Sequence, residues 1–84
     1  MSKLFLEVEV PGIAKTYEFT ADSSMTVKKV KEAIIAQIET LENHSIFHDK
    51  DEVLFCSADL KGLLQEDEIL RSVGVKSGGK IILL

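Results

Sequence analysis

The chain has 84 residues, of which 45% are hydrophobic and 29% are charged, a composition typical of one small folded domain rather than a disordered or collagen-like chain. Ten Lys and Arg residues against 14 Asp and Glu residues give a net charge of −4, a sign that argues against binding nucleic acid or an anionic membrane through counterion release. We therefore expect a single domain over residues 1–84 with no nucleic-acid partner.

Targeting signals are not evident in the sequence. The longest apolar runs, at residues 33–36, 53–56 and 81–84, are far shorter than the roughly 20 residues of a membrane span, and the start of the chain lacks the segments of a signal peptide. Cys56 is the only cysteine and has no internal disulfide partner. We therefore expect a reducing, cytoplasmic location without direct membrane insertion.

The first part of the chain predicts a β-hairpin. In residues 4–10, apolar side chains at the even positions alternate with Phe5 and two glutamates, which is the period of a half-buried strand. Pro11 and Gly12 supply a turn, and the alternation returns in residues 17–22. The short connection favours two antiparallel strands.

The hydrophobic period then changes to that of a helix, over about residues 26–42, with Thr26 as the expected N-cap. The predicted apolar stripe contains Val27, Val30, Ile34, Ile38 and Leu41. The side chains expected to face water are Lys28, Lys31, Glu32, Gln37 and Glu39. An amphipathic helix of this kind must pack on another layer.

The remaining segments predict a loop and further strands. Residues 43–52 are polar and contain both histidines, so they are expected to form a loop. Residues 53–56 predict a third strand, residues 58–62 a turn, and residues 63–64 a minor strand.

The end of the chain predicts one short helical turn and a closing strand. Residues 69–75 fit the helical turn, which Gly74 can end at positive φ. The turn at residues 77–79 then leads into a last strand at residues 80–84. A helix crossing one face of a mixed sheet is an α+β arrangement of two layers.

This order of segments resembles the ubiquitin-like β-grasp family across nearly the whole chain. The likeness is carried by the opening hairpin, the helix segment at 25–34, the strand Val53-Leu54-Phe55, and the hydrophobic spacing of residues 64–83. The resemblance implies a mixed four- to five-stranded sheet with one amphipathic helix, about 26–42, packed across it.

A narrower resemblance is carried by residues 61–64, Asp67, Leu70 and residues 79–84. These segments are similar to the small bacterial ubiquitin-like proteins of the YukD and EsaB type. The resemblance implies an accessory or regulatory role in a type VII (ESX/WXG100) secretion system of a Gram-positive bacterium. The implied partner is a secretion-system membrane protein or ATPase, with weak homo-oligomers as a further possibility.

The glycine pair of the chain bears on conjugation. Ubiquitin and the β-grasp sulfur carriers act through a flexible tail that ends in Gly-Gly, whereas here Gly78 and Gly79 precede a strand that ends at Leu84. A tight turn needs a permissive backbone at such a place. We therefore expect no conjugation, no sulfur transfer and no enzymatic activity. The alternatives are a modifier or carrier matured from a different form, and a ubiquitin-like domain of a larger protein.

Strand alternation also predicts a protein-binding patch on the sheet face away from the helix. Its residues are Phe5, Leu54, Ile82 and Leu84. The residues expected to face the helix are Leu4, Leu6, Val8, Tyr17, Phe19, Val53, Phe55, Ile81 and Leu83. Since the first, last and third strands of a β-grasp sheet are neighbours, the four outward residues can form one patch. The alternatives are ordinary scattered apolar surface and self-association.

Catalytic and metal sites are not supported by the residues available. A metal site would need His44 and His48 with the carboxylates Asp49, Asp51 and Glu52, but a solvated loop accounts for these residues without a third fixed ligand. Cys56 with either histidine lacks an orienting residue and an oxyanion-binding feature. We therefore expect no catalytic residue, no metal and no cofactor.

Overall fold

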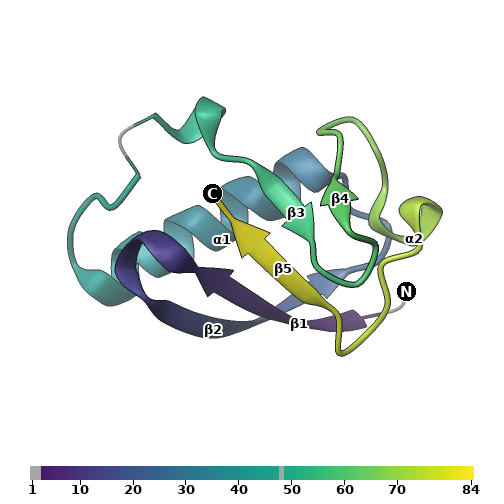
Figure 1. Ribbon diagram of the computed structural model, residues 1–84, viewed down its shortest axis with the longest axis horizontal. Helices are drawn as coiled ribbons and strands as arrows, with labels where there is room; N and C mark the ends of the chain where they lie inside the picture. Colours follow the sequence, from purple (N-terminus) through teal and green to yellow (C-terminus); the bar gives the residue numbers. More distant parts are fainter. Residues whose placement is uncertain (1–2, 48) are drawn as a thin grey trace.

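The computed structural model describes residues 3–47 and 49–84, and in them one long helix crosses a five-stranded mixed sheet (Figure 1). The elements are β1 (Lys3–Val10), β2 (Lys15–Asp22), α1 (Val27–Glu42), β3 (Phe55–Ser57), β4 (Gly62–Leu63), α2 (Leu70–Val73) and β5 (Lys80–Leu83), with 3-10 turns at Pro11–Ile13 and Lys50–Glu52. The strand order is β2-β1-β5-β3-β4, with β1 parallel to β5 and the other pairs antiparallel. The α+β class predicted from the sequence is confirmed.

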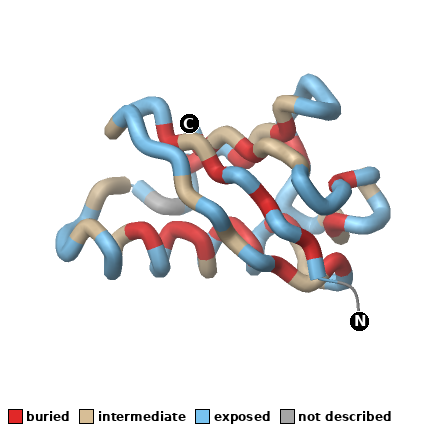
Figure 2. Tube along the Cα trace, turned by 90° about the horizontal axis from the view of Figure 1, so that it is seen from below, coloured by how far each residue is buried: buried red, intermediate tan, exposed pale blue. Residues whose placement is uncertain are grey.

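The predicted hairpin is present, with β2 starting at Lys15. All eight residues of β1 pair with β2, from Lys3 opposite Asp22 to Val10 opposite Lys15. The turn closes at Ala14, which has a left-handed φ of 54°. Buried and exposed residues alternate along β1, as Figure 2 shows, because every second side chain faces the helix.

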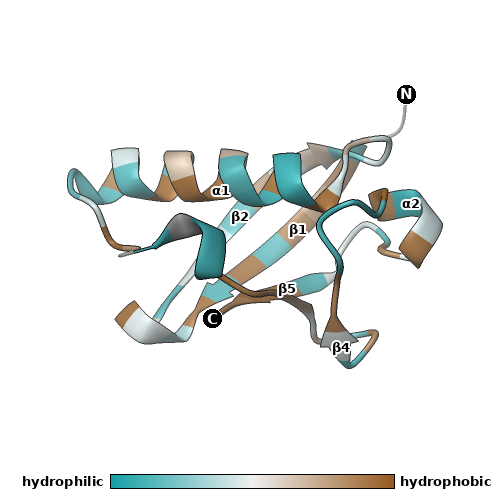
Figure 3. Cartoon of the chain, turned by 90° about the horizontal axis from the view of Figure 1, so that it is seen from above, coloured by the Kyte–Doolittle hydropathy of each residue, from teal (hydrophilic) through white to brown (hydrophobic). Residues whose placement is uncertain are grey.

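Helix α1 begins as predicted. The Thr26 hydroxyl accepts a hydrogen bond from the Lys29 backbone N–H at 3.3 Å, so it caps the first turn. The backbone N–H groups of Val27 and Lys28 donate to carbonyls of Glu68 and Glu66 at 2.8 and 3.0 Å. The segment before α2 therefore also satisfies the start of α1. Figure 3 shows the hydrophobic side of α1 turned toward the strands.

The predicted apolar stripe of α1 is wrong at its C-terminal end. Leu41 is 63% exposed, whereas Ile35, which the stripe left out, is buried. Leu41 lies on the side of α1 that meets β2, the edge strand, and no further strand of the described chain covers it. Ile35 lies one turn after Lys31, on a side of the helix that the chain near Val53 covers.

Lys31 was expected to face water, and this expectation is wrong. The side chain is buried, with 4% of the residue exposed. Its ammonium donates to the Val53 carbonyl at 3.2 Å and to the Glu66 carboxylate. A buried lysine is tolerated when its charge is paired and its stem packs against apolar groups. The partners come from segments 22 and 35 residues away, so the helical period alone could not reveal them.

Glu39 was also expected to face water, but it is half-buried. Its carboxylate accepts backbone hydrogen bonds from Ile46 at 3.0 Å and Phe47 at 3.4 Å. These bonds hold the chain after α1 against the helix, and both apolar residues pack on the core.

The strand boundaries in the second half differ from prediction by one or two residues. Strand β3 starts at Phe55, two residues later than predicted, because the pairing with β5 begins there and the buried Val53 takes no part in it. Strand β4 is Gly62–Leu63 instead of residues 63–64. Leu54 and Leu84 extend the β3–β5 pairing by exchanging two backbone hydrogen bonds of 3.0 and 3.1 Å. Gly74 ends α2 with a φ of 90°, as predicted.

Candidate protein-binding surface

Apolar side chains gather on the outer sheet face, opposite α1, around β3, β4 and β5. Cys56 of β3 pairs with Ile82 of β5 on one side and with Leu63 of β4 on the other. Directly paired residues project to the same face of a sheet. Leu54 lies two positions before Cys56 and Leu84 lies two positions after Ile82, and the two leucines continue the β3–β5 pairing, so they share this face. We call the group the sheet patch: Leu54, Cys56, Leu63, Ile82 and Leu84.

Three leucines of the sheet patch are strongly accessible. Leu54 is 46% exposed, Leu63 is 50% exposed and Leu84 is 61% exposed, while Cys56 and Ile82 between them are half-buried. The opposite face of the same strands is closed, because Phe55, Ile81 and Leu83 are almost completely buried. The sheet patch is therefore an apolar surface separate from the hydrophobic core.

Phe5 does not join the sheet patch, although it is 64% exposed and shares the outer face. The Gly78 N–H donates to the Phe5 carbonyl at 2.6 Å, whereas Ile82 lies opposite Glu9. Phe5 and Glu9 are four residues apart along β1, so Phe5 and Ile82 are separated by about 13 Å along the strand direction. The sequence placed Phe5 on the correct face but could not give the register between β1 and β5.

An ion pair borders the sheet patch beside Ile82. The Lys80 ammonium lies 2.9 Å from the Glu9 carboxylate across the parallel β1–β5 pair. The hydrogen bond from Lys80 to Glu9 raises the pKa of Lys80, which means that the contact stabilises the charged ammonium form. A charged rim beside an apolar centre is typical of surfaces that bind proteins.

Two members of the sheet patch were missed at the sequence level. The sequence predicts Leu63 in a minor strand and Cys56 at the end of the third strand, as a packed or edge cysteine, but it assigns neither residue to the outward patch. Both face outward because β4 pairs with β3 at Cys56. The sequence indicates the first of them through its two consecutive leucines, Leu63 and Leu64, because neighbouring residues of a strand project to opposite faces and one of the two must then face outward.

The Gly78-Gly79 pair serves the turn before β5. Gly78 has a φ of 86°, and a Cβ at Gly79 would lie 2.8 Å from the Lys76 carbonyl oxygen, closer than side chains tolerate. Both glycines are therefore required by local geometry. The strand that follows them is the middle strand of the sheet.

The residues that the sequence offers for a metal site are not brought together within the described part of the chain. His44 is exposed and its Nδ1 lies 2.8 Å from the Glu42 carbonyl oxygen, and His48 lies outside the described residues. Within residues 3–47 and 49–84, no three His, Cys, Asp or Glu side chains are grouped to hold a metal ion. In the same residues, no helix has the length and apolar character needed to span a membrane.

Comparisons with known proteins identify the fold. No model of a known protein family matches the sequence, and no curated protein matches it. Among solved structures, the chain is similar to Caldiarchaeum subterraneum ubiquitin, with a TM-score of 0.75 and 19% identity over 98% of this chain and 91% of that one. It is also similar to the ubiquitin-like domain of Plasmodium falciparum Dsk2, with a TM-score of 0.71 and 18% identity over 98% and 96%.

A third similar structure is the ubiquitin-like domain of an Arabidopsis thaliana protein, with a TM-score of 0.72 and 18% identity over 100% of this chain and 78% of that one. Identities this low establish the fold alone. The chain has a ubiquitin-like β-grasp fold.

Proposed function

We propose that the protein is a non-enzymatic, ubiquitin-like module that binds another protein through the sheet patch. The observation that carries this proposal is the exposure of Leu54, Leu63 and Leu84 around Ile82 on one face of the sheet. A contiguous apolar patch rimmed by charge is a common feature of protein interfaces.

Within this proposal, the partner belongs to a bacterial type VII secretion system. The support is the resemblance of residues 61–64, Asp67, Leu70 and residues 79–84 to the YukD and EsaB type. The role would be that of a cytoplasmic accessory or regulatory component. A membrane protein or ATPase of the secretion system would then be the protein that contacts the sheet patch.

A second part of the proposal is that the chain is not conjugated to other proteins through Gly79. Its support is the use of Gly78 and Gly79 in a turn that their backbone geometry demands. Processing after Gly79 would also remove β5 from the middle of the sheet. Incubation with ATP and an activating enzyme is expected to give no adenylate, and detection of one would contradict this part of the proposal.

Crosslinking and affinity capture from the cell of origin test the binding proposal. The bait is the wild-type protein or its Leu54→Asp variant. The control is Leu41→Asp, because Leu41 is also an exposed leucine, 63% against 46% for Leu54, and lies on α1 outside the sheet patch. We expect wild type and control to recover a secretion ATPase or membrane component, and Leu54→Asp to recover much less. Equal recovery by all three would contradict the sheet patch, while a lysine-linked adduct would favour a modifier.

A further inference from the structure

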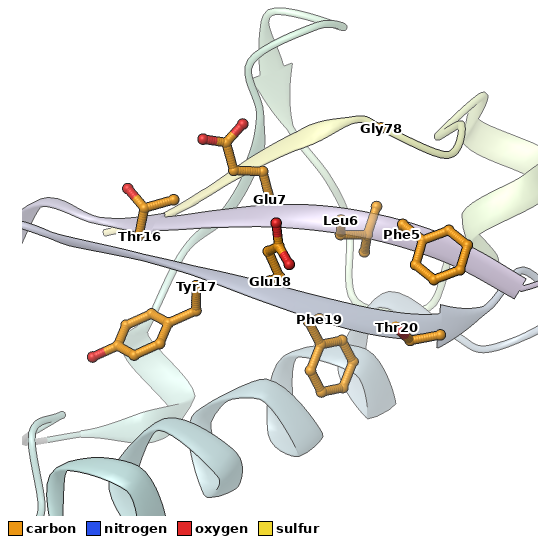
Figure 4. A pocket seen from close by; sticks show the side chains of 9 residues that line it. All are labelled: Phe5, Leu6, Glu7, Thr16, Tyr17, Glu18, Phe19, Thr20 and Gly78. Carbon is orange, nitrogen blue, oxygen red and sulfur yellow. The ribbon is translucent and has the colours of Figure 1, made fainter.

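The outer face of the β1–β2 hairpin, opposite α1, carries side chains that remain open to solvent. Three directly opposed pairs project from this face: Phe5 with Thr20, Glu7 with Glu18, and Glu9 with Thr16. Among these residues, only Glu9 is half-buried and the others are exposed. The pairs line an open hollow, which Figure 4 shows from close by. A partner can therefore reach this face without any movement of the described chain.

The centre of this face holds two carboxylates in direct opposition. The Phe5 carbonyl accepts a hydrogen bond from Gly78, and the Glu7 N–H donates to the Gly79 carbonyl at 2.9 Å, so both residues of β1 direct their backbone groups to β5. Glu7 and Glu18 therefore form a non-hydrogen-bonded pair, the type in which opposed side chains lie closest. Like charges placed in this way repel each other.

Neither carboxylate of this pair forms a salt bridge within the described part of the chain. The lysines of the adjoining segments already have partners: the Lys80 ammonium lies 2.9 Å from Glu9, and the Lys15 ammonium lies 2.7 Å from Glu42. Lys80 also feels the charge of Glu7, but its direct contact is with Glu9. The pair is therefore a negative site without a counter-ion of its own, on a protein whose net charge is −4, and it attracts a cationic group.

An aromatic ring lies beside the two carboxylates. Phe5 is 64% exposed and precedes Glu7 by two residues on the same face, a separation of about 7 Å along the strand. Figure 4 shows Phe5 and Glu7 on β1 with Glu18 beside them on β2. The face of an exposed ring attracts a cation through its quadrupole. Two negative charges and an aromatic surface are therefore available within the span of one long side chain.

We propose that the outer face of the hairpin binds an arginine side chain of a basic partner protein. The guanidinium lies between the carboxylates of Glu7 and Glu18, and the side chain covers the Phe5 ring. Arginine fits better than lysine, because its planar group has five donors that reach two carboxylates at once and it also stacks on aromatic rings.

A second copy of this chain is a poor source of that arginine. The one arginine of the sequence, Arg71, already interacts with Asp22 of its own chain, and two molecules of charge −4 repel each other. The arginine site lies on β1 and β2, whereas the sheet patch lies on β3, β4 and β5. The two surfaces can therefore be tested separately.

An NMR titration with short peptides tests the proposal. The probe is an acetylated, amidated peptide with two arginines between glycines, and its controls carry lysine or uncharged citrulline in place of arginine. The arginine peptide should shift the amide signals of Phe5, Glu7, Glu18 and Thr20 and should bind about fivefold more tightly than the lysine peptide, while the citrulline peptide should not bind. Equal binding of the arginine and lysine peptides, or shifts centred on residues 66–68 instead, would overturn the proposal.

Matched variants of the protein separate this site from attraction by net charge. Glu18→Gln should weaken the arginine peptide by about fivefold, since it removes half of the carboxylate pair. Glu32→Gln removes the same charge at an exposed position on α1 and should leave the affinity within about twofold. Phe5→Leu keeps an apolar side chain without the ring and should weaken binding about threefold. Equal affinities for the two glutamate variants would contradict the arginine site.

Discussion

Tyr17 is the only tyrosine of the chain, so its ionisation can be followed directly. Desolvation, followed by the hydrogen bond that its hydroxyl donates to Glu42 at 2.7 Å, raises the pKa of Tyr17 from 10.0 to about 12. A raised folded-state pKa means that this contribution to stability is complete below pH 10 and is lost as the pH rises through about 12. Absorbance of tyrosinate against pH should show this late midpoint.

The variant Glu42→Gln separates the causes of that shift. Removing the carboxylate charge should lower the pKa of Tyr17 toward its ordinary value, but only in part, because desolvation is the larger cause. Lys15→Met is the control, since it removes the amine that also contacts Glu42 and leaves the Tyr17 hydrogen bond in place. A Tyr17 titration near pH 10 in the wild type would contradict the observed contact.

Lys31 and Glu66 should respond unequally to mutation. Lys31→Met keeps the buried stem and leaves a carboxylate that water can solvate, because the Glu66 side chain is 50% exposed. We expect it to change the free energy of unfolding by no more than about 1 kcal/mol. Glu66→Ala instead leaves the buried ammonium without its counter-ion and should destabilise the protein more. Urea unfolding measures both, and an equal or smaller loss for Glu66→Ala would contradict the account.

Acid should weaken this same contact. The hydrogen bond from Lys31 holds the pKa of Glu66 below its ordinary value of 4.5. A depressed folded-state pKa contributes stability that is present above pH 4.5 and is lost as the pH falls through the lower, folded-state value. In Lys31→Met, the unfolding free energy should therefore depend less on pH below 4.5 than it does in the wild type, as urea titrations at several pH values would show.

At the scale of elements, the turn before β5 makes a direct prediction. Gly79→Ala places a Cβ 2.8 Å from the Lys76 carbonyl oxygen, so the turn must shift, at an expected loss of about 1–3 kcal/mol in unfolding free energy. Gly12→Ala is the matched control, because nothing lies within 4 Å of its added Cβ, and it should change stability by less than about 0.5 kcal/mol. Thermal and urea unfolding give both values, and equal effects would contradict the role assigned to Gly79.

Elements with local signals were predicted well from the sequence. The hairpin depends on alternation and on Pro11-Gly12, and α1 depends on the helical period and the Thr26 cap, all of which are readable within a short window. The short strands β3 and β4 were misplaced by one or two residues because their ends depend on pairing with β5 and with each other. Lys31 and Leu41 were misassigned for a similar reason, since distant segments decide what covers each side of the helix.

At the scale of the whole molecule, the sequence predicted the outward face of four apolar residues but not their grouping. The register of β1 against β5 separates Phe5 from Ile82, and the pairing of β4 brings Leu63 into the sheet patch. The protein therefore presents one apolar surface, the sheet patch, over the neighbouring strands β3, β4 and β5 (Figure 1).

The central claim is that the sheet patch binds a protein, and a dissociation constant tests it most directly. Calorimetric titration of the captured partner should be made with the wild type, Leu54→Asp and Leu41→Asp, after circular dichroism shows that all three are folded. We expect Leu54→Asp to weaken binding by about 30-fold, the effect of removing a central interface contact worth about 2 kcal/mol, while Leu41→Asp matches the wild type. Equal dissociation constants for all three proteins would contradict the account.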